Sequence, residues 1–278
     1  SSDLEGDLNR MTRPDDWDVP LRQIDAVINA SGALQSGGGD RLDAIQEQSI
    51  IALIEACERQ DIHRFVQISA PAASTTDPSP FLATKALADA RLKISSLHWS
   101  ILRPGLVVGR NAYGGTALVR ALAAMPVGII TVHGDRTVHT VAMDDVVQAA
   151  LFCLAADAMP GRDVDLVERE ERSLADLIAS HRQWLGLPPP RFRIDLPPMI
   201  AGIAAWIADM LGSLGWRSPL RSTAMAMIVR DVTGDAATGE ALLGRPVAGL
   251  EETLLRHPAG MQDRWNAPII MLMRLIVG

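Results

Sequence analysis

The feature that most constrains this chain is an alternation, over its first 156 residues, of short apolar runs with longer segments of helical period. The runs at residues 24–29, 64–69 and 99–102 have the composition of strands buried on both faces. Between them, residues 40–60 and 80–95 repeat apolar side chains at helical spacing, with Asp40 as a plausible N-cap. Alternating strands and helices with short connections predict an α/β fold, a Rossmann-like doubly wound parallel sheet with helices on both faces.

The pattern continues less regularly toward the C-terminus. It predicts helices at residues 116–124 and 143–156, and a strand at 129–132. Beyond residue 160 only 163–167 and 191–194 have the character of strands, and helices are expected at 173–185, 199–214, 219–230, 236–243 and 250–256. We therefore expect a mainly helical C-terminal lobe over residues 161–260, followed by an apolar segment at 261–278.

Composition excludes several classes of function. The net charge of −7 makes nucleic acid an improbable partner, because an acidic surface repels phosphate backbones. Cys57 and Cys153 occur without metal-ligand spacing and are expected to be buried thiols, and the six histidines suggest no metal site. Residues 1–10 are polar, unlike a signal peptide, and no uninterrupted apolar stretch has the length of a membrane span. These observations favour a cytoplasmic protein.

The glycine-rich phosphate loop of a dinucleotide-binding domain is missing from this sequence. Neither G-x-G-x-x-G nor G-x-x-G-x-x-G occurs, and the three glycines at 37–39 follow the wrong strand. In the strand order 3-2-1-4-5-6, residues 3–8 would end the third strand and residues 24–29 would form the fourth. We therefore hypothesise that the first βαβ unit is absent, which would leave residues 24–29 as an exposed apolar edge and weaken or abolish dinucleotide binding.

Six short motifs follow one another in the first 146 residues. They are Gly-Asp-Leu at 6–8, the run at 24–32, Phe-Val-Gln-Ile-Ser at 65–69, Phe-Leu-Ala-Thr-Lys at 81–85, Ile-Leu-Arg-Pro-Gly at 101–105 and Val-Ala-Met-Asp-Asp-Val at 141–146. In this order they resemble the short-chain dehydrogenase/reductase superfamily. More narrowly, they resemble atypical extended members related to sugar epimerases and dehydratases and to the NADPH-binding accessory subunit of respiratory complex I. The resemblance implies an NAD or NADP cofactor bound by residues 1–160.

The resemblance also assigns cofactor-binding residues. Asp7 and Leu8 would line the adenine pocket. Asn29, Ala30 and Gly32 would lie along the cofactor, where small residues let the backbone approach it. The acidic or basic residue that selects NAD or NADP normally follows the second strand. We do not expect that strand in this sequence.

Four further residues would serve the reacting end of the cofactor. Ser69 would stand at the catalytic serine's strand end, and Lys85 would hold the nicotinamide ribose and support the reacting oxygen. Arg103 and Pro104 would wall the nicotinamide and a small-molecule substrate, which would sit between the sheet and the helical lobe.

The sequence departs from the superfamily at its catalytic pair, Tyr-x-x-x-Lys. The spacing is kept, but Phe81 stands where the tyrosine belongs, and the only tyrosine, Tyr113, is not one turn from Lys85. Either another acid serves hydride transfer, or the domain binds nucleotide without turnover. The chain is therefore interpreted as an NAD(P)-binding oxidoreductase-like protein, with a non-catalytic nucleotide-binding or assembly module, or a redox sensor, as alternatives.

The C-terminal segment at 264–278 allows two interpretations. Some bacterial members with this pattern continue into a DoxX-like membrane segment, and Arg264 with Trp265 would suit a headgroup boundary. Location at the inner face of a membrane, or a membrane-protein partner, would follow. The alternative is an ordinary terminal helix docked on the core.

Overall fold

The computed structural model describes residues 5–32, 41–112, 114–125, 128–155, 158–197, 231–260 and 263–264. The chain forms two compact units. The first comprises Ser1–Pro104, Val146–Leu166 and Ala237–Arg245, and the second comprises Gly105–Asp145, Val167–Ala236 and Pro246–Gly278.

The first unit is built on a parallel sheet. Its strands are β1 (Ala26–Asn29), β2 (Arg64–Ile68), β3 (His98–Pro104) and β8 (Arg162–Leu166), in the order β1-β2-β3-β8. Phe65, Val66, Ile101 and Leu102 in the central strands are almost completely buried, as strands covered on both faces require. The predicted Rossmann-like sheet is confirmed.

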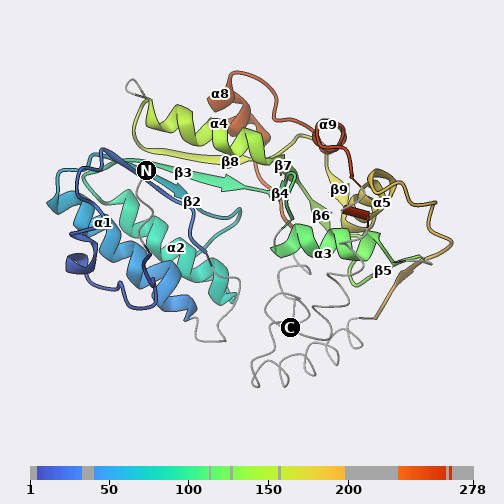
Figure 1. The fold of residues 1–278 in the computed structure, drawn as a ribbon, viewed down its shortest axis with the longest axis horizontal. Coiled ribbons are helices and arrows are strands. Elements are labelled where there is room, and N and C mark those ends of the chain that lie inside the picture. Colours follow the sequence, from blue (N-terminus) through green and yellow to red (C-terminus); the bar gives the residue numbers. More distant parts are fainter. Residues whose placement is uncertain are drawn as a thin grey trace. The chain divides into compact units, whose positions relative to one another are not determined.

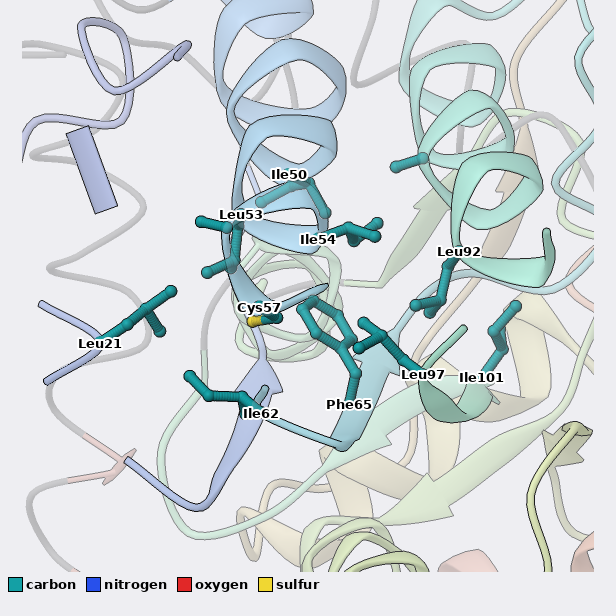
Figure 2. Close-up of a cluster of buried hydrophobic side chains, with 12 residues drawn as sticks. Leu21, Ile50, Leu53, Ile54, Cys57, Ile62, Phe65, Leu92, Leu97 and Ile101 are labelled. Carbon is teal, nitrogen blue, oxygen red and sulfur yellow. The ribbon is translucent and has the colours of Figure 1, made fainter. Parts of the chain in front are cut away.

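Helices cover both faces of this sheet. A π-helical turn, η2 (Ala44–Gln48), leads into α1 (Ser49–Arg59), and α2 (Pro80–Lys93) starts with proline at its first position, where the missing N–H costs nothing. Figure 1 shows α1 and α2 on one face, and α4 (Met143–Leu154) and α8 (Ala236–Leu243) on the other. Figure 2 shows side chains of α1 and α2 meeting those of the strands around Phe65, with the thiol of Cys57 buried among them.

Strand β1 has a free edge in the part of the chain that the structure describes, where it pairs only with β2. On this strand, the residue Ile28 is 45% exposed. The 3₁₀ turn η1 (Pro14–Trp17) packs near α1 and helps to line a hollow of about 460 Å³ beside this strand. The expected exposed apolar edge is thus present.

The second unit combines short strands with helices. Strand β4 (Leu106–Val108) pairs with β7 (Thr140–Ala142), β5 (Ile129–Thr131) with β10 (Arg193–Asp195), and β6 (Thr137–Val138) with β9 (Arg172–Ser173). Its helices are α3 (Gly114–Ala123), α5 (Leu174–Trp184) and α9 (Leu250–Arg256). Strands β4, β6, β7 and β9 were not predicted, because runs of two or three residues carry no readable period.

The ends of α5 follow from local chemistry. The hydroxyl of Ser173 accepts a hydrogen bond from the backbone N–H of Asp176 at 3.1 Å, as a capping serine should. Gly186, at φ +71°, ends the helix in the left-handed conformation that glycine adopts without strain. The helix predicted over residues 173–185 is confirmed.

One predicted element is wrong and others cannot be compared. Residues 5–8 form no strand, and Asp7 instead starts a turn in which its carbonyl accepts from the N–H groups of Arg10 and Met11. A strand needs a hydrogen-bonded neighbour, and the described residues offer this segment none. The helices expected at 199–214 and 219–230, and the Asp40 cap, lie outside the described residues. Within the described residues, no helix is both long and apolar enough to cross a membrane.

Candidate functional site

Three predicted site segments lie at the same edge of the first unit's sheet. Asn29 is the last residue of β1, Ser69 directly follows β2, and Arg103 and Pro104 end β3. Because these strands are parallel and adjacent, their carboxyl ends meet, where doubly wound sheets bind ligands. All the residues to which the sequence assigned site roles belong to this one unit.

The loop after β1 is shaped by Asn29. Its side-chain amide donates to Gln67 Oε1 at 2.8 Å, and its Oδ1 accepts from the backbone N–H and the hydroxyl of Ser31, at 3.0 and 2.6 Å. Asn29 is buried, so these bonds tie the backbone and the hydroxyl of Ser31 to the end of β1. Asn29 therefore positions this loop.

The two N-terminal site residues lie differently. Leu8 lines the same hollow as Asn29 and Ala30. The carboxylate of Asp7 is half-exposed and is engaged in its own turn, where it accepts from Asn9 and pairs with Arg10.

Lys85 is buried on α2 beside the strand ends. Its Nζ donates to the carbonyl of Ile68 at 3.1 Å and lies 5.8 Å from the centroid of the Phe81 ring. Burial lowers the pKa of Lys85 to about 8, against the opposing charge of Asp89. The lysine is thus a desolvated amine, and the ring one turn before it has no group that could exchange a proton with it.

Ser69 is part of a buried network that the sequence did not predict. Its hydroxyl donates to Asp89 Oδ2 at 2.6 Å, and the same oxygen forms an ion pair with a terminal nitrogen of Arg103 at 3.0 Å. Arg103 also donates from its Nε to Asp163 Oδ1 at 2.6 Å. Asp163 Oδ2 accepts a further hydrogen bond, from Lys93 Nζ at 2.6 Å. A chain of alternating charges therefore runs from the surface of α2 to the serine.

Burial and hydrogen bonding shift the pKa values of the two carboxylates of this network, Asp89 and Asp163, in opposite directions. Desolvation raises the pKa of Asp89, despite the hydrogen bond from Ser69 and the charge of Arg103. For Asp163, which is less buried, desolvation is outweighed by the hydrogen bonds from Arg103 and Lys93, so its pKa is lowered. In the described part of the chain, Asp89 Oδ1 is buried without a hydrogen-bond partner.

A signal for Asp89 exists in the sequence. It lies four residues after Lys85, on a helix whose neighbouring positions Leu82, Ala86 and Leu92 are apolar and buried. An acidic residue on the core face of a helix requires a partner, and a site is the usual reason to retain one. Asp163 gave no such signal, because strand ends often carry a charge.

The residues around Gly32 fit one side of a dinucleotide. A Cβ at Gly32 would lie 3.5 Å from Gln46 Nε2 and 3.7 Å from Lys85 Nζ, so the missing side chain leaves space directly before two nitrogen donors. A cation and an amide beside bare backbone suit ribose hydroxyls and phosphate oxygens. Groups of side chains able to hold a metal ion are absent from the described residues.

The parallel sheet order, with the candidate residues at its carboxyl edge, is that of a doubly wound α/β domain. Residues 4–155 match the family model described as NAD(P)H-binding, and the chain belongs to this family. It is 27% identical over 160 residues to the uncharacterized sugar epimerase YhfK of Bacillus subtilis, covering 56% of this chain and 68% of that protein.

Solved structures confirm the fold. The Bordetella bronchiseptica enzyme WbmG, in complex with NAD and UDP, superposes with a TM-score of 0.68 at 13% identity, over 95% of this chain and 80% of that one. The UDP-glucuronic acid 4-epimerase of Bacillus cereus, in complex with UDP-glucuronic acid and NAD, gives a TM-score of 0.62 at 16% identity, over 91% and 78% of the two chains.

Proposed function

We propose that this chain is an NAD(P)-binding protein of the oxidoreductase and epimerase type in which the proton-transfer site is degenerate. The observation that carries the proposal is the pairing of Phe81 with Lys85, the Phe81 ring lying 5.8 Å from the lysine Nζ. When bound, the nicotinamide supplies hydride chemistry. The position from which a phenol would exchange the accompanying proton holds a hydrocarbon ring instead.

The hydroxyl of Ser69 does not replace the phenol. Its proton is directed at Asp89, and Arg103 donates to its oxygen at 3.4 Å. One lone pair is left toward a ligand, so Ser69 can accept a hydrogen bond but cannot donate one while Asp89 is ionised. Lys85 remains as a donor that can hold a hydroxyl or a ribose.

The substrate class of an active form would be a carbonyl compound or a nucleotide sugar. The names of YhfK and of the solved UDP-glucuronic acid 4-epimerase, and the NAD and UDP bound to WbmG, support this choice. The expected NAD(P)-binding domain at residues 1–160 and substrate lobe at 161–260 stay a proposal, because each of the two observed units takes residues from both ranges. Association with a membrane through residues 261–278 stays a proposal, and most of that segment lies outside the described residues.

A non-catalytic nucleotide-binding module, or a redox sensor, is the second candidate. The same two observations favour it, because Phe81 cannot exchange a proton and Ser69 is turned toward Asp89. The two candidates differ in one respect. A degenerate enzyme should regain chemistry when its tyrosine is restored, whereas a module that never presents substrate to the cofactor should not.

The experiment that tests the proposal measures binding and turnover separately. Quenching or enhancement of NADPH fluorescence would report binding, which we expect to be weaker than micromolar because the sequence has no glycine-rich phosphate loop. NADPH oxidation with a panel of carbonyls and nucleotide sugars would report turnover, which we expect to be absent. Micromolar binding would contradict the first expectation, and steady turnover would contradict the second.

A further inference from the structure

The chain contains two lysines, Lys85 and Lys93, although lysine and arginine together number 26. Both lie on α2, in different surroundings. The side chain of Lys93 is 42% exposed and its Nζ donates to Asp163 at 2.6 Å, so this lysine is held as a paired ammonium ion. The residue Lys85 is 7% exposed, and within the described residues it forms no salt bridge. The two lysines therefore differ in burial and in pairing, which control the reactivity of an amine.

The Nζ of Lys85 uses only part of its hydrogen-bonding capacity. It donates to the carbonyl of Ile68 at 3.1 Å, at the end of β2. The ring of Phe81, one turn earlier on α2, has its centroid 5.8 Å from Nζ and carries no proton to exchange. The charge of Asp89 acts on the lysine from one turn later, but the carboxylate of Asp89 pairs with Arg103 at 3.0 Å. The amine is thus left without a counter-ion of its own.

Space for a reacting carbon atom lies beside this nitrogen. A Cβ added to Gly32 would lie 3.7 Å from Nζ and 3.9 Å from Cε of Lys85, and 3.5 Å from Nε2 of Gln46, all of which are ordinary van der Waals contacts. A carbon atom can therefore rest against the amine without displacing either side chain. The Nε2 of Gln46 is a donor, so an oxygen atom bonded to that carbon would have a hydrogen-bonding group at hand. A carbonyl group fits this position.

We infer that Lys85 is a nucleophilic amine that forms an imine with a small aldehyde or ketone. The uncharged amine attacks the carbonyl carbon, so that a C–N bond forms and a proton passes from nitrogen to oxygen. The resulting carbinolamine loses water and leaves a C=N bond, and no electrons are exchanged with another reactant. Removing a lysine from water is a general way to make it a nucleophile. The step needs no nicotinamide, so it goes beyond the proposed function and can fail independently of it.

The charge state of Lys85 supports the same inference. Burial lowers its pKa to about 8, so that about one-tenth of the amine is uncharged at pH 7. From β2 and η2 it meets two neutral groups, the Ile68 carbonyl and the Gln46 amide. The charge of Asp89, which Arg103 binds from β3, favours the ammonium form but is outweighed by desolvation. The reactive fraction should therefore increase as the pH rises through about 8.

The first test traps the imine on the full chain. Acetaldehyde or hydroxyacetone is added with cyanoborohydride, which delivers hydride to the imine carbon and fixes the adduct as a secondary amine, and peptide mass spectrometry locates it. We expect Lys85 to be modified at least about tenfold faster than Lys93 near neutral pH, at a rate that levels off above about pH 8. Modification in proportion to exposure, with Lys93 ahead, would overturn the inference. So would a Lys85 that stays unmodified at every pH.

The second test concerns the direction of approach. Gly32→Ala fills the space beside Nζ and should slow trapping at Lys85 at least about tenfold, without changing the rate at Lys93. Lys93→Arg is the matched control on the same helix and should leave trapping at Lys85 unchanged, whereas Lys85→Arg keeps the charge and should abolish it. A folded Gly32→Ala that traps at the wild-type rate would overturn the proposed site. The comparison of the two lysines in the wild type needs no variant, so it holds even if Lys85→Arg fails to fold.

Discussion

Ser69 donates its hydroxyl proton to the buried carboxylate of Asp89, over a distance of 2.6 Å. The relationship joins the end of β2 to the middle of α2, and Arg103 joins the same carboxylate to the end of β3. Ser69, which we expected at the strand end of the superfamily's catalytic serine, is here hydrogen-bonded to the scaffold. The hydroxyl of Ser69 is therefore not available to donate a hydrogen bond to a ligand. The coupling free energy between Ser69 and Asp89 measures the strength of the network.

A double-mutant cycle of Ser69→Ala and Asp89→Asn tests that network. A buried hydrogen bond to a charged group contributes about 1.5–3 kcal/mol, so we expect a coupling free energy of at least about 1 kcal/mol. Urea denaturation of the four proteins would measure it. The matched control is the exposed pair of Ser96 and Glu58, whose side chains are 3.3 Å apart. That pair should couple by less than about 0.5 kcal/mol. Similar coupling in both pairs would contradict a special role for Ser69 and Asp89.

The lowered pKa of Lys85 predicts a pH dependence of stability. Its pKa is about 8 in the folded chain against 10.5 as the ordinary value. Between these two pH values the unfolded chain binds more protons, so the free energy of unfolding should rise as the pH rises through this window. Below pH 8 the lysine is charged in both states, and the full cost of burying it is present.

The variant Lys85→Met removes this cost. At pH 7 we expect it to be more stable than the wild type by up to about 3 kcal/mol, and to lose the rise between pH 8 and 10.5. Lys93→Met is the control, because Lys93 lies on the same helix but is 42% exposed. That variant should keep the rise. If Lys85→Met keeps it too, another group is responsible.

Substitution by alanine should change the free energy of unfolding little at one glycine and strongly at another. At Gly32 the new Cβ meets nothing closer than 3.5 Å, so Gly32→Ala should change the free energy of unfolding by less than about 1 kcal/mol. It would nevertheless fill the space before Lys85, and we expect NADPH binding to weaken about tenfold. Fluorescence titration and urea denaturation of the same samples measure both effects.

Gly105 supplies the contrast. Its Cβ would lie 2.5 Å from the carbonyl oxygen of His139, which is backbone and cannot yield without a shift of the chain. Gly105→Ala should therefore cost about 1–3 kcal/mol. If Gly32→Ala is destabilised, or if Gly105→Ala is as stable as the wild type, the distances given for the added Cβ atoms are wrong.

The sequence predicted the parts of the fold that depend on long apolar periods. Strands β1, β2 and β3, helices α2 and α4, and the continuous segment of η2 and α1 were found within a few residues of their observed ends, because each buries a continuous face. The prediction of a strand at residues 5–8 is wrong because a strand requires a hydrogen-bonded neighbour, which a local sequence pattern does not show.

The candidate site was predictable where it follows from topology. Ser69, Arg103 and Asn29 lie at strand ends, and parallel strands bring such ends together whatever the side chains do. The direction of the Ser69 hydroxyl was not predictable, since it depends on Asp89, twenty residues away. The engagement of Asn29 with Gln67 was hidden for the same reason.

The most direct test of the degenerate proton-transfer site is NADPH oxidation by the wild type and by Phe81→Tyr, at millimolar cofactor, with the same panel of carbonyls and nucleotide sugars. We expect no turnover by the wild type and measurable turnover by Phe81→Tyr, which should disappear again when Lys85→Met is added. Turnover by the wild type would contradict a degenerate proton-transfer site. A silent Phe81→Tyr that binds NADPH as the wild type does would contradict the view that the missing phenol is what silences this chain.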